Sequence, residues 1–404
     1  DILFFWVARM MMFGLEFTGQ VPFHTIYLHG LILDKDGQKM SKTKGNVVDP
    51  LEVMNNFGTD ALRFTMLVGS TPGHDTNLDL KKVEANRNFA NKVWNAGRFV
   101  ISALENASDA ANKEPEWTLA DSWIWARLQT LLRDTDRLFT SYQYGEAGRQ
   151  IYDFFWGDFA DWYLEIAKTQ LAEGGDRAYY TATTLVRVLD ACLRLLHPFT
   201  PFVTEELWHY LKEAALEKKF RPFNSIKAWE EALIIARWPE AGKPEAWEEK
   251  AITEFSVIQE AVRAIRNIRA EKKVKPGKKI PALISAGSRF ETMKDQRTTL
   301  IALASLDDSK TQIAEKVTVD TSGSISLVVS GVEVFLPMEG FAGDEKDQER
   351  MQQELEVVKS QIERLEKLLG SDFASKAPAA VVDKEKAKLK DYLETRSKLE
   401  SQLK

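Results

Sequence analysis

The segment with the clearest capacity for chemistry is a lysine-rich loop at residues 39–46, which reads Lys-Met-Ser-Lys-Thr-Lys-Gly-Asn. Lys39, Lys42 and Lys44 lie close together, and the Gly45-Asn46 pair indicates a turn at the end of the loop. Three ammonium groups can surround a polyphosphate and stabilise the charge that develops on a leaving pyrophosphate. The loop therefore predicts phosphoryl or nucleotidyl transfer, and a solvated charged loop without a ligand is the alternative.

A second polar set follows one face of a predicted helix. Amide and guanidinium side chains recur at spacings of three, four and three from Asn88 to Arg98, so they share a helix face. We expect an exposed Phe99 beside them, and this combination can read unstacked single-stranded bases. A solvated helix face is the alternative interpretation. The predicted RNA contacts on this helix are Lys81, Asn91, Asn95, Arg98 and Phe99.

A basic cluster lies further along the chain, between Arg263 and Lys279, with Glu271 as its one acid. Its three arginines are spaced by three and so share a helix face. We expect this face to follow RNA phosphates, although a solvated basic surface is again the alternative. The three predicted contacts are Arg263, Arg266 and Arg269.

Hydrophobic periodicity indicates the elements that position these residues in the first half of the chain. Residues 1–49 combine a helical stretch through Phe13 with a strand-like run over 25–33, which predicts the end of an α/β layer. Asp49-Pro50 pairs an N-cap residue with a proline at the first helical position, and short helices are expected over 50–80. Apolar residues at helical spacing over 81–238, such as those from Phe89 to Leu104, predict a helical bundle.

The second half has a different pattern. A linker over 239–244 precedes residues 245–343, where a helix to Ala270 and strand-like runs over 279–285, 316–320 and 324–336 predict a small α+β domain. Over 344–404, apolar residues alternate spacings of four and three, and the run returns after a turn. This predicts an antiparallel coiled coil, which alone could also bind a protein partner. The whole fold is predicted to be multidomain and mainly α.

Composition sets limits on the partners. The 404 residues carry 54 basic and 60 acidic side chains, so RNA would have to meet local basic patches rather than a global field. A single cysteine, Cys192, and five scattered histidines predict no disulfide and no bound metal, and favour a cytoplasmic setting. No apolar run approaches the roughly 18 residues of a membrane span.

The lysine loop resembles the lysine-methionine-serine-lysine-serine loop of class I aminoacyl-tRNA synthetases, with Thr43 in place of the second serine. Together with 46–50 and 58–67 it is similar to subclass Ia. The resemblance implies that residues 1–49 end a Rossmann-type catalytic domain, that Lys39 and Lys42 are catalytic, and that ATP with Mg²⁺ is a substrate. A carboxylate suits the ribose hydroxyls and a glycine suits a close-lying adenine. The implied ATP contacts are Asp1, His29, Gly30, Met40, Ser41 and Lys42.

The opening run, residues 1–10, is similar to the valine-specific members of this subclass. That similarity implies that Trp6 lines the amino-acid pocket, while a plain core aromatic is the alternative. Residues 87–95 and 195–208 resemble the anticodon-binding domain of the subclass, and 376–378 with 381–382 resemble the terminal coiled-coil arm. Valine, ATP and the tRNA for valine are the implied partners of a monomer. The implied RNA contacts of the arm are Lys376, Lys384 and Lys388.

The chain starts without a methionine, inside what reads as a folded element. We therefore expect an upstream half of the catalytic domain to be missing, together with an editing domain, and predict no aminoacylation by the chain alone. Two alternatives remain open, namely a non-catalytic tRNA-binding or scaffold protein and an isoleucine-specific sibling. The low cysteine count disfavours the sibling, because many isoleucine enzymes end in a cysteine-rich metal module.

Overall fold

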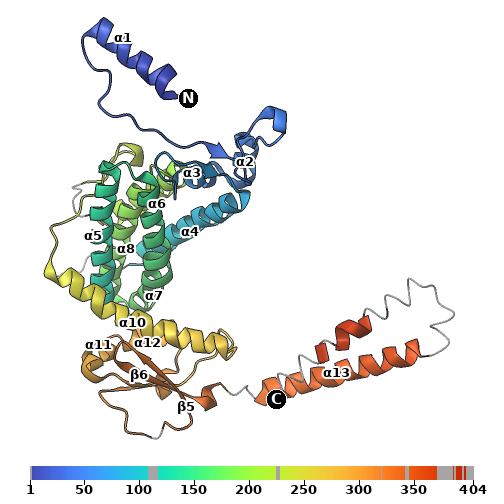
Figure 1. Cartoon of the computed structure of the whole chain (residues 1–404). Helices are drawn as coiled ribbons and strands as arrows, with labels where there is room; N and C mark the ends of the chain where they lie inside the picture. The colour runs from blue at the N-terminus through green and yellow to red at the C-terminus, as the bar shows by residue number, and fades with distance from the viewer. Residues whose placement is uncertain are drawn as a thin grey trace.

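The computed structural model describes residues 2–107, 117–223, 228–319, 321–341, 345–370, 385, 388–393 and 395–396. Figure 1 shows a central helical bundle with a smaller unit of helices and a sheet at one end. One helix stands apart from the bundle at the N-terminal side, and a long helix projects at the C-terminal side. The prediction of a mainly α protein is confirmed, and the strands of the described residues form two small sheets.

The N-terminal segment is helical for longer than expected. A π-helical stretch, Leu3–Val7, continues into α1, Ala8–Thr18, which ends at Gly19 with φ 67°. Further on, β1, Ile32–Leu33, pairs in parallel with β2, Thr76–Asn77. The strand predicted over 25–33 is therefore wrong except for its last two residues. Only that end has a neighbouring strand among the described residues, and a strand needs a partner for its backbone groups.

Two short helices connect this segment to the bundle. Helix α2, Pro50–Phe57, starts as predicted, because the carboxylate of Asp49 accepts the Leu51 N–H at 2.9 Å and Pro50 takes the first position. Helix α3, Thr59–Leu67, follows directly at Gly58, whose φ of 93° suits glycine. Their inner faces form a small core with the bundle; it contains Val53, Ala61, Leu62 and Val83.

The bundle holds most of the hydrophobic core. The apolar positions predicted from Phe89 to Leu104 are buried, as expected from their spacing. Gly97 permits a close helix crossing, since a Cβ there would lie 2.4 Å from Leu207. A π-helical segment, Phe154–Tyr163, was not predicted by the helical spacing. The bundle helices are α4, Leu80–Glu105, α5, Leu119–Thr140, α6, Tyr144–Asp153, α7, Leu164–Ala172, α8, Gly175–Leu196, and α9, Pro201–Glu217.

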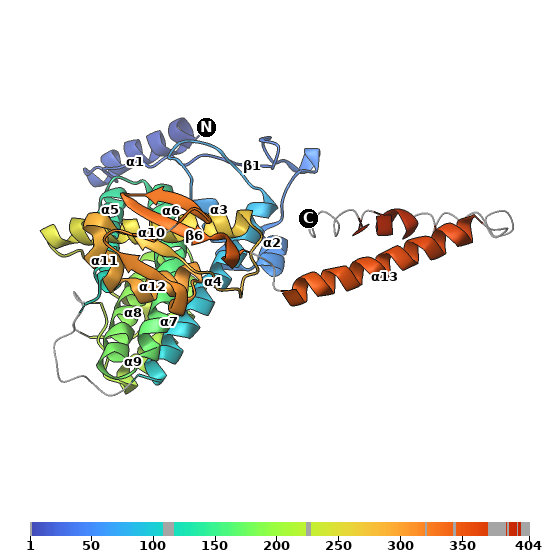
Figure 2. The ribbon, with the colours of Figure 1, turned by 90° about the horizontal axis from the view of Figure 1, so that it is seen from below.

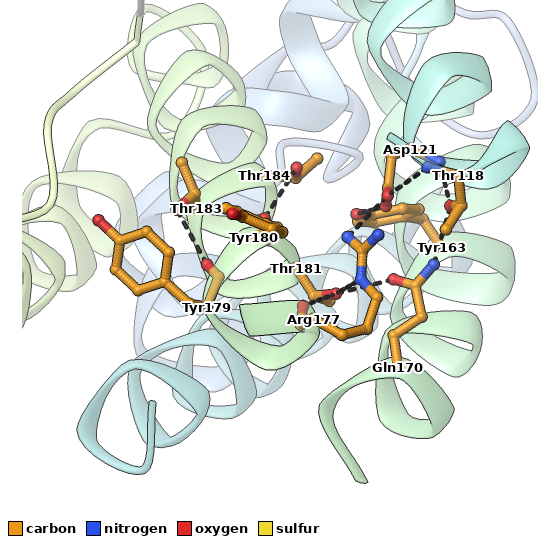
Figure 3. Close-up of polar contacts among 10 residues, drawn as sticks. All are labelled: Thr118, Asp121, Tyr163, Gln170, Arg177, Tyr179, Tyr180, Thr181, Thr183 and Thr184. Atoms are coloured by element: carbon orange, nitrogen blue, oxygen red, sulfur yellow. Dashed lines mark hydrogen bonds and ion pairs between the residues drawn. The ribbon is translucent and has the colours of Figure 1, made fainter. Parts of the chain in front are cut away.

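A buried polar network joins the bundle helices near the start of α5 (Figure 3). Asp121 accepts the Tyr163 hydroxyl at 2.7 Å, the Arg177 guanidinium at 2.8 Å and the Thr118 backbone N–H at 3.0 Å. The amide of Gln170 on α7 donates to the Thr118 hydroxyl at 3.0 Å. One carboxylate therefore holds α5, the π-helical segment and α8 together, because each donor comes from a different part of the chain.

The smaller unit begins with α10, Ala246–Glu271, which lies between the bundle and the sheet (Figure 1). The sheet has the strand order β4-β3-β6-β5, in which β3 pairs in parallel with β4 and antiparallel with β6. Two helices complete the unit. The bounds are β3, Leu283–Ser285, α11, Phe290–Asp295, α12, Arg297–Ala304, β4, Gln312–Ala314, β5, Ser324–Val329, and β6, Val332–Pro337.

Two of the three strand predictions in this unit are confirmed. The run over 279–285 contains β3, and the run over 324–336 is a hairpin that turns at Ser330 and Gly331, both with positive φ. The strand predicted over 316–320 is wrong in its described residues, 316–319, because β4 lies earlier, where Gln312 donates to the Ala282 carbonyl at 2.9 Å. Pairing with β3 thus determines which residues form the strand.

The projecting helix is α13, Glu345–Leu369. Its residues Leu355, Val358 and Ile362 pack against Leu389, Tyr392 and Leu393. Seen from below, the described residues of the return, 388–393, lie alongside α13, away from the bundle (Figure 2). The predicted seam is therefore present where the structure describes both sides; Leu399 and Leu403 lie outside the described residues. Within the described part of the chain, no helix combines the length and hydropathy needed to cross a membrane.

Candidate functional site

The lysine loop follows β1 after a short turn at residues 35–37. Ser41 caps a single 3-10 turn, Lys42–Lys44, by accepting the Lys44 N–H at 3.3 Å, and Gly45 ends the turn with φ 67°. Lys39, Lys42 and Lys44 are exposed, so their ammonium groups are free to meet an anion. The turn is closed by local hydrogen bonds, as the Gly45-Asn46 pair predicted.

Two side chains from outside the turn hold the loop. The buried carboxylate of Asp34 accepts the backbone N–H groups of Gln38 and Asp36, at 2.7 and 3.0 Å. Its second oxygen accepts the Asn46 amide at 2.7 Å, and Asn46 in turn accepts the Ser41 N–H at 2.9 Å. These hydrogen bonds, that of Gln38 first, hold the pKa of Asp34 below its ordinary value, because they favour the charged carboxylate.

The predicted adenine contacts, His29 and Gly30, lie just before β1 in the sequence, whereas the lysine loop follows it. A pocket of about 330 Å³ is lined by His29, Gly30, Met66, His74 and their neighbours. The position that a Cβ of Gly30 would take is 1.8 Å from the His74 carbonyl oxygen, so only glycine fits there. Close packing against His74 thus explains why residue 30 is a glycine, whereas contact of Gly30 with a base stays a prediction.

The predicted amino-acid pocket is not assembled by the described residues. Trp6 is 66% exposed, so the alternative of a core aromatic is wrong for this chain. Phe4, Phe5, Met12 and Phe13 surround an apolar hollow on the same helical segment, which Trp6 does not line. Asp1, the predicted ribose ligand, lies outside the described residues.

The amide face of α4 is accessible. Asn91, Asn95 and Arg98 are exposed on it, as is Lys81 near its start. Phe99 was predicted to be exposed, and this is wrong. Its side chain is half-buried and packs against the core, with the Lys168 ammonium 5.9 Å from its ring. Its ring is therefore only partly exposed, and its contact with a base stays a prediction.

The arginine face of α10 is divided between surface and interior. Arg269, predicted to contact phosphate, is only 7% exposed, and its guanidinium donates to the carbonyls of Lys278 and Ser305 at 2.8 and 3.2 Å. Burial lowers the pKa of Arg269, since desolvation disfavours the charged form. The prediction is wrong for Arg269, because these backbone acceptors hold it inside the protein.

The other two arginines, Arg263 and Arg266, lie on the surface and contact neighbouring elements. The guanidinium carbons of Arg263 and Arg266 lie 5.4 and 5.6 Å from the Trp162 ring, and Arg266 also donates to the Leu303 carbonyl at 2.7 Å. These contacts join α10 to the π-helical segment and to α12. In the arm, Lys388 pairs with Glu385 at 2.6 Å. Lys376 and Lys384 lie outside the described residues.

Curated relatives match this chain over its whole length. A protein named "Valine--tRNA ligase" from Dehalococcoides mccartyi (strain CBDB1) is 43% identical over 402 residues, which is 99% of this chain. Relatives with the same name from Carboxydothermus hydrogenoformans and Bacillus subtilis are 39% and 36% identical over all of this chain. This chain is a homologue of the valine-tRNA ligases. It spans 44% of the length of each of these three relatives.

Three family descriptions match separate parts of this valine-tRNA ligase homologue. Residues 1–79 match "tRNA synthetases class I (I, L, M and V)", and residues 121–284 match "Anticodon-binding domain of tRNA ligase". Residues 345–404 match "Valyl tRNA synthetase tRNA binding arm". The second match runs from α5 through α10 into β3, and so includes residues on both sides of the linker at 239–244.

Sequence reasoning missed several side chains of this homologue that the structure brings to the candidate sites. Asp34 and Asn46 hold the lysine loop, but the sequence indicated Asn46 only as part of the closing turn and did not single out Asp34. On α4, Lys92 lies 4.7 Å from the Trp156 ring and pairs with Asp161 at 2.5 Å. No spacing rule joins residues 64 or 69 positions apart, so this contact had no sequence signal.

Proposed function

We propose that this chain serves in the ATP-dependent attachment of valine to its tRNA. The observation that carries the proposal is the exposed lysine loop, held on the buried Asp34, in a chain that is similar throughout to valine-tRNA ligases. Ammonium groups on a loop that hydrogen bonds hold in place suit charge that grows on a polyphosphate, since preorganised charges need no rearrangement during the reaction.

The proposed roles at the catalytic end follow from residue chemistry. Lys39 and Lys42 bind the phosphates of ATP, which arrives with Mg²⁺, and stabilise the departing pyrophosphate as valine is activated. His29, Gly30, Met40 and Ser41 contact ATP from either side of β1. Trp6 borders the valine pocket and Asp1 binds the ribose.

The proposed RNA contacts extend along the rest of the chain. Exposed Asn91, Asn95 and Arg98 read anticodon bases from α4, because amides and guanidinium groups hydrogen-bond to base edges. We assign residues 50–80 to contact with the tRNA stem, 81–238 to the anticodon-binding domain and 245–343 to a connecting domain. The arm, 344–404, binds the outer corner of the tRNA. Basic residues that contact phosphates are Lys81, Arg263, Arg266, Lys376, Lys384 and Lys388.

Activity is tested after joining the chain to the remaining length of the Dehalococcoides mccartyi relative. Valine-dependent exchange of pyrophosphate into ATP, and charging of valine tRNA, are then measured. We expect both activities, and a loss of about 100-fold or more in exchange for Lys42→Ala, the size of losing one charge-stabilising group. Lys35→Ala, which removes an exposed lysine from the preceding turn, is the matched control and should keep full activity.

A non-catalytic tRNA-binding protein is the competing function. A joined protein that folds and binds ATP and tRNA but never charges it would establish that alternative. The isoleucine-specific alternative has no support, because the three relatives described above are valine ligases and the arm matches a valyl family. We further propose that the protein acts as a monomer in the cytoplasm.

A further inference from the structure

The hydrogen bonds around the lysine loop converge on one pair of side chains, Asp34 and Asn46. Asp34 is 9% exposed and follows β1 directly, so its backbone is fixed by the pairing of β1 with β2. Backbone bonds on both sides strengthen this attachment, since Thr76 donates to Leu31 and Leu78 donates to Leu33, each at 2.9 Å. The carboxylate of Asp34 is therefore a rigid point beside an exposed loop.

Asn46 connects both ends of the loop to that point. Its amide nitrogen donates to the Asp34 carboxylate at 2.7 Å and to the Lys39 carbonyl at 3.3 Å. Its amide oxygen accepts the Ser41 N–H at 2.9 Å. One amide thus ties the first lysine of the loop, the cap of the 3-10 turn and the end of the loop to one buried carboxylate. A side-chain amide offers a donor and an acceptor side by side in one plane, and glutamine, the other such amide, is longer.

We propose that Asp34 and Asn46 are positioning residues, which hold the backbone that carries Lys39 and Lys42 in the geometry needed to bind the phosphates of a nucleoside triphosphate. The proposal rests on the proposed function for its kinetic consequence but not for its structural one. Neither side chain needs to touch the nucleotide. Their effect is on the lysines, since a loop that must be ordered at the moment of reaction loses part of its charge stabilisation.

The proposal can be tested by exchanging the carboxylate of Asp34 and the amide of Asn46. Asn46→Asp removes the donor and places a second carboxylate against Asp34, which breaks the attachment of the loop. The double variant Asp34→Asn with Asn46→Asp restores one amide and one carboxylate in contact. It also keeps acceptors for the Gln38 and Ser41 N–H groups, but it replaces the bond to the Lys39 carbonyl by a contact between two acceptors. Asn56→Asp, which adds the same charge on the exposed face of α2, is the matched control.

The first measurement is made on the full chain and needs no nucleotide. The rate of tryptic cleavage after Lys39, Lys42 and Lys44 is followed by mass spectrometry, because cleavage requires the loop to open. We expect about tenfold faster cleavage for Asn46→Asp, as for one lost hydrogen bond to a charged group, and a slower rate, closer to that of the original chain, for the double variant. Equal rates for all three proteins would overturn the proposal.

The second measurement is pyrophosphate exchange in the joined protein described above. We expect Asn46→Asp to lower kcat about tenfold with little change in KM for valine, and the double variant to recover most of it. Faster cleavage combined with unchanged exchange would reduce the pair to a purely structural contact and overturn the positioning role. A joined protein with no exchange before any substitution would instead contradict the proposed function, and the cleavage rates would still decide whether the pair holds the loop.

Discussion

Asp121 and Arg177 meet at 2.8 Å inside the bundle, with side chains that are 1% and 17% exposed (Figure 3). The first residue lies in the opening turn of α5 and the second in the opening turn of α8. Because the Tyr163 hydroxyl shares the same carboxylate, burial together with the neighbouring negative charge raises the pKa of Tyr163 well above its ordinary value. The contact fixes two helix starts at one end of the bundle.

Asp121→Asn should therefore destabilise the protein strongly. The change removes the carboxylate that the largely buried Arg177 guanidinium and the Tyr163 hydroxyl share, and we expect the free energy of unfolding to fall by about 2 to 4 kcal/mol. Urea denaturation followed by circular dichroism measures it. Asp134→Asn on the same helix is the control, because Asp134 forms an exposed pair with Arg137 at 3.3 Å and should cost less than about 0.5 kcal/mol. Equal losses would show that the buried contact has no special weight.

Stability should rise with pH around the ordinary pKa of histidine because of His197. Its ring is half-buried, and Nδ1 lies 2.9 Å from the Thr204 hydroxyl. Burial lowers the pKa of His197 below 6.5, and the positive charge of Arg63 lowers it further. The nearby carboxylates of Glu205 and Asp60 oppose this shift without cancelling it. Below pH 6.5 the unfolded chain binds a proton that the folded protein does not, so stability falls as the pH falls.

The check is the free energy of unfolding of His197→Asn between about pH 5 and pH 7.5, a range that brackets histidine titration. The variant should show a smaller rise with pH than the original protein. His209→Asn, which removes an exposed imidazole from α9, is measured beside it as the comparison. A slope that is the same in all three proteins would assign the pH dependence to other groups.

Arg269→Ala should unfold the smaller unit more easily while leaving the exposed basic surface in place. The guanidinium satisfies the carbonyls of Lys275, Lys278 and Ser305, which would be left without this donor. We expect a loss of about 2 kcal/mol or more, measured by thermal unfolding. Arg263→Ala, in which an exposed arginine loses its contact with Trp162, is the comparison and should cost about 0.5 to 1 kcal/mol. A reversed order would contradict the assignment of Arg269 to the interior.

Asn95→Ala should weaken recognition of the anticodon rather than general RNA binding. Fluorescence anisotropy with valine tRNA and with the same tRNA carrying a changed anticodon separates the two effects. We expect about tenfold weaker binding of the native tRNA and little change for the altered one, as for one lost base contact. Lys272→Ala, at an exposed basic position, should weaken both equally and lower the salt dependence by about one charge. If the unchanged chain binds both tRNAs equally, α4 does not recognise the anticodon.

The amino-acid sequence by itself determined the features that depend on short stretches of chain. Helical spacing identified the buried positions of α4, and Asp49-Pro50 marked the start of α2, because periodicity and capping involve only residues within a few positions of one another. The lysine loop was recognisable for the same reason, since its composition and its closing glycine are contiguous.

The tertiary structure alone decided which members of those patterns are available. Arg263 and Arg269 share one spacing on α10, yet only Arg269 is buried, because its carbonyl acceptors lie at residues 275, 278 and 305. Phe99 turned toward the core, and β4 formed at 312–314 rather than later, because packing and strand pairing depend on distant neighbours. The contact of Asp34 with Asn46 belongs to the same class. It joins two polar residues 12 positions apart, and only the folded backbone brings a carboxylate and an amide of ordinary appearance within 2.7 Å.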